Sequence, residues 1–203
     1  MAAYIWDLDG TLLDSYPVII AAALKAAAEA GIHDEEAYAL RIAKQGMLFT
    51  YLNDVAERSG MPFQTLRESY RTYTHEMDGR ITLMAGAREA LERLRDTGAA
   101  HYVFTHRGTS SEPILERLGI LGYFREIVTS AAGFQAKPSG DAVRYLVQKY
   151  SLKADETWYV GDRSIDVLCA EDAGVRSVLL LPEGACVTPT GHEDRIIRSL
   201  DEL

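Results

Sequence analysis

The chain has 203 residues, 47% of them hydrophobic, which suits one domain or one domain carrying an insertion. Lysine and arginine total 21 against 30 aspartate and glutamate residues, and the resulting net charge of −9 argues against general nucleic-acid binding. The sequence has no apolar run of membrane-spanning length, no signal-peptide pattern and no metal-binding cysteine spacing. We therefore expect a soluble cytoplasmic protein with no nucleic-acid or membrane partner. We expect it to be a monomer or a homodimer.

The first predicted strand covers residues 3–6, and Asp7 and Asp9 follow it directly. Two carboxylates this close repel each other unless a cation lies between them, which favours a Mg²⁺ site with a carboxylate free to act as a nucleophile. The alternative is an ordinary turn, because aspartate and glycine are common turn residues. The pair alone does not decide between these interpretations.

A long helical stretch follows, with almost no strand-like alternation between residues 14 and 85. Its breaks at glycine and proline predict four helices: one after Ser15 and Pro17 running to residue 30, one opening at Asp34, one over 47–58 and one over 63–77. A helical insert of that size forms a domain of its own. We therefore predict a helical cap domain at 14–85 inserted into a core of residues 1–13 and 86–203.

Four more short apolar runs follow, at residues 101–105, 126–129, 157–160 and 177–181. Most are separated by stretches of helical length and pattern, with helices expected after Ser110, from Asp141 and over 162–173. This alternation predicts an α/β fold in which a central parallel sheet carries helices on its faces, as in a Rossmann-like three-layer core.

Polar residues follow the carboxyl ends of these strands, where ligands of open α/β sheets collect. In chain order they are Asp7, Asp9 and Thr11, then Thr105, then Lys137, and last Asp162 and Asp166. Taken singly, each has an ordinary explanation as a loop hydroxyl, a surface lysine, a helix N-cap at residue 162 or an exposed acid at residue 166. Taken together, they supply the nucleophile, hydroxyl, cation and metal-binding acid that a phosphate site requires.

With these residues in this order and spacing, the chain resembles the haloacid dehalogenase-like (HAD) superfamily, specifically its phosphatases with a helical cap inserted after the first motif. The resemblance covers the whole length. The segments that carry it are Asp7-Leu8-Asp9-Gly10-Thr11 as motif one, Val103-Phe104-Thr105 as motif two, Lys137-Pro138 as motif three and Gly161-Asp162 to Asp166 as motif four.

The resemblance implies that Asp7 attacks phosphorus and forms an aspartyl-phosphate, and that Asp9 protonates the leaving oxygen and then deprotonates water. It also implies Mg²⁺ held by Asp7, the backbone carbonyl of Asp9 and Asp162. Asp166 is expected to support Lys137 or a metal-bound water rather than to bind the metal itself.

The remaining motif residues are implied to surround the phosphoryl group. Thr11, Thr105 and Lys137 would bind it, and Gly10 permits the turn that points both acids inward. An acid at position 9 disfavours a dehalogenase, because enzymes of this fold that attack carbon lack it there.

Three residues lie where this chain departs from the related phosphatases or where the cap is expected to meet the substrate. His106 and Arg107 follow Thr105 in place of a small polar residue. His106 is expected to offer its backbone amide. Arg107 either binds a carboxylate or second phosphate of the substrate or is a solvated loop residue. Lys44, in a segment expected to be a loop between two cap helices, either faces the substrate or is a surface lysine before a glycine turn. Hinges are expected near residues 14–16 and 83–86.

These expectations converge on a Mg²⁺-dependent phosphatase that hydrolyses a small phosphorylated metabolite, of phosphoglycolate phosphatase-like type. A β-phosphoglucomutase-like sugar-phosphate mutase is the alternative with the same fold. A signalling module that accepts phosphate on an aspartate without turnover is the alternative from another class, and the helical insert and Asp9 argue against it.

Overall fold

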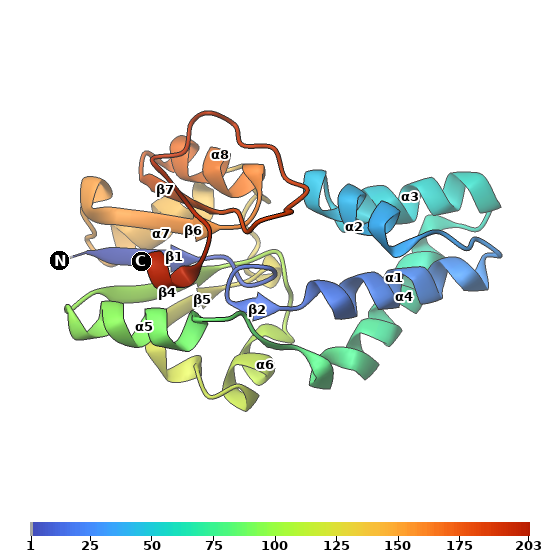
Figure 1. Ribbon diagram of the computed structural model, residues 1–203, viewed down its shortest axis with the longest axis horizontal. Helices are drawn as coiled ribbons and strands as arrows, with labels where there is room; N and C mark the ends of the chain where they lie inside the picture. Colours follow the sequence, from blue (N-terminus) through green and yellow to red (C-terminus); the bar gives the residue numbers. More distant parts are fainter. Residues whose placement is uncertain (1) are drawn as a thin grey trace. The chain divides into compact units, whose positions relative to one another are not determined.

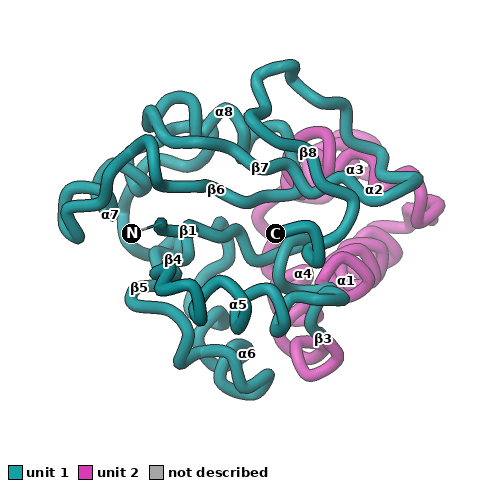
Figure 2. Tube along the Cα trace, turned by 60° about the vertical axis from the view of Figure 1, so that its left-hand side comes forward, with its two compact units in different colours: residues 1–14, 82–203 teal, residues 15–81 magenta. Residues whose placement is uncertain are grey.

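The computed structural model describes residues 2–203, and contacts within the chain divide it into two compact units (Figure 2). One unit comprises residues 1–14 and 82–203, and the other residues 15–81. The expected boundaries at 14 and 85 move slightly because Leu13–Asp14 (β2) and Thr82–Leu83 (β3) pair as antiparallel strands, which keeps both segments in the first unit.

A six-stranded parallel sheet forms the centre of the first unit within the described residues (Figure 1). The strands lie in the order β5-β4-β1-β6-β7-β8. Their bounds are Ala3–Trp6 (β1), Ala100–Phe104 (β4), Phe124–Val128 (β5), Thr157–Gly161 (β6), Arg176–Leu180 (β7) and Arg195–Ile197 (β8). The three-residue strand β8 was missed by the sequence analysis, because so short an edge segment carries no clear apolar run.

Helices cover both faces of this sheet. They are Ala87–Asp96 (α5), Ser111–Arg117 (α6), Asp141–Lys149 (α7) and Ser164–Ala173 (α8). One face packs residues of β1, β4 and β6 against Leu146 of α7 and Ala170 of α8. His101 of β4 points to the opposite face, where its Nε2 lies 3.2 Å from the carbonyl oxygen of Leu91 in α5. The predicted three-layer α/β core is therefore confirmed.

The second unit is built from four α-helices, all within the described part of the chain. They are Tyr16–Glu29 (α1), Glu36–Gln45 (α2), Leu48–Ser59 (α3) and Phe63–Met77 (α4). Their facing sides bury an apolar core that includes Ile20, Leu52 and Leu66. The alanines of α1 let its neighbours pack closely, and Gly60 ends α3 in the left-handed conformation at φ 76°.

One local prediction is wrong: residues 41–46 were expected to form a loop, but residues 41–45 are the last turns of α2, which ends at Gln45 before Gly46. The alternative explanation of Asp162 as a helix N-cap is excluded, because that position belongs to Arg163 and α8 begins at Ser164. No helix among residues 2–203 has both the length and the apolar character needed to span a bilayer.

Candidate active site

The loop that follows β1 places Asp7 at the carboxyl end of the sheet. The Asp7 N–H donates to the carbonyl of Val160 at 2.9 Å, which fixes the backbone of Asp7 against strand β6. Gly10 has a φ of 82°, and the carbonyl of Leu8 accepts hydrogen bonds from the amides of residues 11, 12 and 13. This tight turn needs a glycine because a side chain is strained at positive φ.

Lys137 joins two acids of the site. Its Nζ lies 2.8 Å from Oδ1 of Asp7 and 2.8 Å from Oδ1 of Asp166, and all three side chains are buried. The ammonium also lies over the rings of Phe104 and Tyr159, at 5.4 and 5.3 Å from their centroids. Lys137 is therefore a buried counter-charge rather than a surface lysine.

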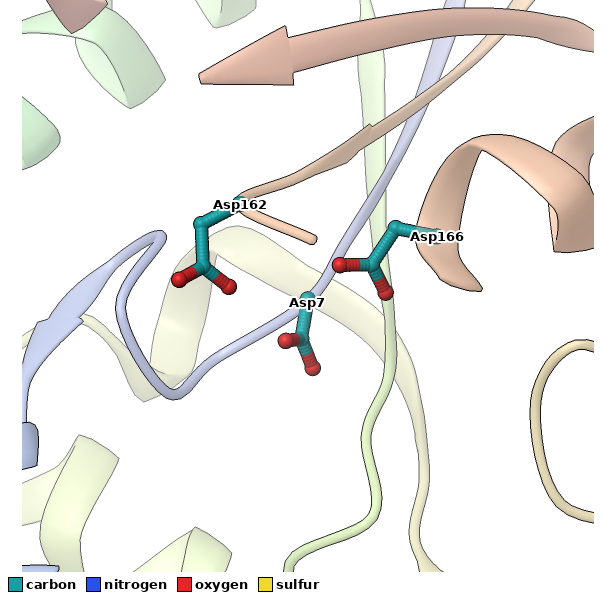
Figure 3. A group of neighbouring side chains, drawn as sticks. All are labelled: Asp7, Asp162 and Asp166. Carbon is teal, nitrogen blue, oxygen red and sulfur yellow. The ribbon is translucent and has the colours of Figure 1, made fainter. Parts of the chain in front are cut away.

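Asp162 and Asp166 complete an acidic group with Asp7 (Figure 3). Asp162 follows β6, Asp166 lies in the first turn of α8, and ligand oxygens of the three carboxylates lie within 4.8 Å of one another. Asp166 uses both of its oxygens: Oδ1 accepts from Lys137 Nζ, and Oδ2 accepts from the Arg163 amide at 3.0 Å. The explanation of Asp166 as an exposed charge is excluded, because its exposed fraction is 1%.

The electrostatics of this group are dominated by burial and by Lys137. Burial raises the pKa of Asp7 to about 6, and the Lys137 ammonium offsets part of that rise. Burial also acts to raise the pKa of Asp166, but the positive charges of Lys137 and Arg163 outweigh it and lower the pKa. Burial acts to lower the pKa of Lys137, yet its two carboxylate partners raise it, so the lysine stays charged.

The residues present fit a divalent cation. Oδ2 of Asp7 is buried and has no hydrogen-bond partner among residues 2–203, although an unpaired buried carboxylate oxygen is costly. Three buried acids lie together, the nearby positive charge comes from Lys137 and Arg163, and carboxylate oxygens are the ligands that Mg²⁺ prefers. Asp7 and Asp162 can therefore hold a metal.

The loop after β4 brings three further predicted residues to the site. Thr105 is buried, and its Oγ1 accepts a hydrogen bond from the Arg107 amide at 3.1 Å. The His106 side chain, not its backbone alone, contacts the site: Nε2 accepts from the amide of Lys137 at 2.8 Å. This bond puts the ring proton on Nδ1, and burial lowers the pKa of His106 to about 4, which keeps the ring neutral.

Arg107 lies against Asp9 rather than in solvent. Its Nε and Nη2 donate to Oδ1 of Asp9 at 3.0 and 2.8 Å, and the exposed fraction of Arg107 is 8%. The explanation of Arg107 as a solvated loop residue is therefore wrong. Thr11, in the same loop as Asp9, is buried, and its hydroxyl has no hydrogen-bond partner within the described chain.

Lys44 belongs to the second unit, in the last turn of α2. Its Nζ lies 4.3 Å from the centroid of the Tyr16 ring at the start of α1. The structure thus gives Lys44 an aromatic partner within its own unit.

Comparisons with known proteins identify the family of this chain. The family model described as haloacid dehalogenase-like hydrolase matches residues 4–180. The chain belongs to this family. It is 29% identical over 182 residues to the phosphoglycolate phosphatase of Vibrio parahaemolyticus, covering 85% of this chain and 80% of that protein. It is 30% identical over 190 residues to the phosphoglycolate phosphatase of Pseudomonas fluorescens Pf-5, covering 86% and 67% respectively.

Solved structures show the same HAD fold. The crystal structure of a predicted phosphoglycolate phosphatase from Haemophilus somnus superposes with a TM-score of 0.88 at 23% identity, covering 100% of this chain and 96% of that one. CbbY from Rhodobacter sphaeroides in complex with phosphate gives 0.80 at 19% identity, covering 100% and 96%. These structures show the fold, whereas the predicted enzyme class, a HAD-like phosphatase, is confirmed by the family match and by the phosphoglycolate phosphatase relatives.

Sequence reasoning missed several contributors to the site. The Phe104 and Tyr159 rings beside Lys137 come from strand positions that look like ordinary core, and the Tyr159 hydroxyl donates to the Phe104 carbonyl at 2.8 Å. Gly161 was quoted only as part of a motif, yet a Cβ there would lie 2.3 Å from Cβ and Cγ of Asp166. A glycine at the end of strand β6, shortly before Asp166, was the sequence signal for this close approach of the Asp166 side chain to the backbone.

Proposed function

We propose that this protein is a Mg²⁺-dependent phosphatase that hydrolyses the phosphomonoester of a small metabolite, with 2-phosphoglycolate as the first substrate to test. The observation that carries the proposal is the buried group in which Lys137 bridges Asp7 and Asp166 beside Asp162. The names of the phosphoglycolate phosphatase relatives support the choice of substrate. We expect the enzyme to act in the cytoplasm.

Asp7 is the proposed nucleophile, and its buried carboxylate attacks the phosphorus of the ester. As the bond between phosphorus and the ester oxygen breaks, Asp9 gives its proton to that oxygen and an alcohol leaves. Asp9 then takes a proton from water, whose oxygen attacks the aspartyl-phosphate. This second step releases phosphate, regenerates the Asp7 carboxylate and leaves Asp9 protonated again.

Lys137 has two tasks in this proposal: it orients Asp7 through the 2.8 Å contact, and it offsets negative charge on the transferring phosphoryl group. Thr11 and Thr105 supply hydroxyl groups and Gly10 the turn. The metal would be held by Asp7, Asp162 and the backbone carbonyl of Asp9. When bound, Mg²⁺ neutralises charge on the phosphate oxygens.

The helical unit is proposed to act as the cap of the enzyme, with hinges where residues 14–16 and 83–86 join the two units. Lys44 is proposed to bind the part of the substrate that is not transferred.

The proposal is tested by phosphate release from 2-phosphoglycolate and from an aryl phosphate, with Mg²⁺ and with chelator. Asp7→Asn is expected to lower kcat by at least about 10³-fold, because the nucleophile is removed. Asp155→Asn is the matched control, since Asp155 is an exposed aspartate in a short 3₁₀ turn. The control is expected to keep wild-type activity.

Two results would contradict the proposal. Metal-independent turnover, or full activity of pure Asp7→Asn protein, would reject the nucleophile and the metal. Conversion of a hexose 1-phosphate into its 6-phosphate isomer would identify a mutase, and a lasting phospho-aspartate without phosphate release would identify a signalling module.

A further inference from the structure

The contact between Arg107 and Asp9 joins two loops that are far apart in the sequence. Arg107 follows β4, Asp9 follows β1, and two N–H groups of one guanidinium reach the same oxygen, Oδ1 of Asp9, at 2.8 and 3.0 Å. Both side chains are largely withdrawn from solvent, with exposed fractions of 6% and 20%. Charge-assisted hydrogen bonds in such a position are stronger and more directional than bonds between neutral groups.

Arg107 is itself held in place by its own loop. Its amide donates to Thr105 Oγ1 at 3.1 Å and its carbonyl accepts from the Ser130 amide at 3.1 Å, whereas the 3.4 Å separation between Nη1 and Ser110 Oγ lies at the outer limit of a hydrogen bond and adds little. The guanidinium is therefore a fixed support, and the carboxylate that it binds is held in one orientation. Oδ1 of Asp9 accepts both bonds, so the guanidinium sets the direction in which the carboxylate points.

We propose that Arg107 is a positioning residue that fixes the Asp9 carboxylate for proton transfer to the leaving oxygen. This role rests on the proposed phosphatase function, in which Asp9 is the acid and base. It differs from the expectation that Arg107 binds a carboxylate or second phosphate of the substrate, because the guanidinium already serves an anion of the protein. Arginine suits the task because its planar fork presents two donors at once, which lysine does not.

The proposal predicts a dependence on the leaving group. Proton transfer from Asp9 matters most when the departing oxygen is strongly basic, as in an alkyl phosphate, and least for p-nitrophenyl phosphate. Arg107→Ala is therefore expected to lower kcat about 10²-fold on propyl phosphate and less than about 10-fold on p-nitrophenyl phosphate, with KM changed less than about 3-fold on both. Neither substrate carries a second anionic group.

Two further variants separate positioning from general damage. Ser110→Ala removes a contact of the same guanidinium that does not involve Asp9, and it is expected to behave as wild type. Adding Arg107→Ala to Asp9→Asn is expected to lower kcat less than about 3-fold further, because the arginine acts through the aspartate. Arg107→Lys is expected to restore part of the activity on propyl phosphate.

Three results would overturn the proposal. These are an equal loss of kcat on both substrates, a full further loss in the double variant, and a KM increase confined to 2-phosphoglycolate with kcat unchanged. The last result would assign Arg107 to substrate binding.

Failure of the proposed function is seen separately, as wild-type protein that releases phosphate from no ester. The contact between Arg107 and Asp9 would then be measured by urea unfolding of four proteins: the wild type, Arg107→Ala, Asp9→Asn and the double variant. Absence of coupling between Arg107 and Asp9 in that cycle would reject the contact itself.

Discussion

Replacing Gly161 by alanine tests how closely the site is packed around Asp166. Gly161 is the last residue of β6, and an added Cβ would lie 2.3 Å from Cβ and Cγ of Asp166 and 2.4 Å from its Oδ2. Ordinary contacts begin at 3.4 Å, so Asp166 has to withdraw by about 1 Å. A displacement of that size is enough to break its 2.8 Å bond to Lys137.

The expected cost is seen in both activity and stability. Lys137 would lose one of its two carboxylate partners, and a displacement of about 1 Å next to the reacting groups is expected to lower kcat/KM about 10²-fold. Overpacking and the weakened buried ion pair together are expected to lower the free energy of unfolding by about 3 kcal/mol. Phosphate release at varied substrate concentration and urea unfolding measure the two effects.

Gly122→Ala is the matched control, because a Cβ at Gly122 meets nothing within 4 Å and its φ does not fall in the left-handed region. This variant is expected to match wild type in both assays. Wild-type kcat/KM in Gly161→Ala would refute the argument, because it would mean that Asp166 can move without disturbing Lys137. A loss of stability with full activity would refute the link from Asp166 to catalysis while leaving the packing argument intact.

Three other changes have defined outcomes. Lys137→Met is expected to lower the free energy of unfolding, measured by urea titration, by about 3–5 kcal/mol, because it leaves two buried carboxylates without their Lys137 counter-charge. Lys153→Met, at the surface, is the control and is expected to change that free energy little. Mg²⁺ at about 100 times its Kd is expected to stabilise the wild type by about 3 kcal/mol, and Asp162→Asn to remove most of that gain in a thermal unfolding assay. Burial lowers the pKa of His101 to about 4, so below pH 6.5 the unfolded chain binds a proton that the folded chain does not. This one group is expected to lower the free energy of unfolding by about 3 kcal/mol from pH 6.5 to pH 4, in addition to the similar contribution of His106, and a His101→Gln protein with the wild-type pH slope would contradict this.

The sheet and the gathering of the polar residues at one of its edges could be predicted from the sequence. Strand β1 was expected at its observed bounds, and the carboxyl ends of parallel strands lie at the same edge, which brings Asp7 and Asp162 together. Apolar runs and glycine stops carry this information because they act locally. The helix α4 was likewise expected at residues 63–77, since Pro62 and Asp78-Gly79 bracket it.

The partners of individual side chains could not be predicted in the same way. Arg107 was expected to bind the substrate or to face solvent, and nothing in the sequence indicated its contact with Asp9, 98 positions away in the chain. His106 was expected to offer a backbone amide, but its ring accepts from the amide of Lys137. Both contacts depend on how loops after different strands fold over the edge of the sheet, and neither residue type specifies that path.

Asp7, Asp162 and Asp166 are alike in burial, but their hydrogen-bond partners differ. One carboxylate oxygen of Asp166 accepts a hydrogen bond from Lys137 and the other accepts one from the Arg163 amide, so Asp166 would have to lose one of these bonds to ligate a metal. In Asp7, Oδ1 forms an ion pair with Lys137, and Oδ2 is buried without a hydrogen-bond partner in the described chain. We therefore infer that Asp166 supports Lys137 while Asp7 and Asp162 bind the metal. Asp166→Asn is expected to leave the Mg²⁺-dependent stabilisation nearly intact, whereas Asp162→Asn is expected to remove most of it. Equal losses of that stabilisation in the two variants would place all three acids on the metal.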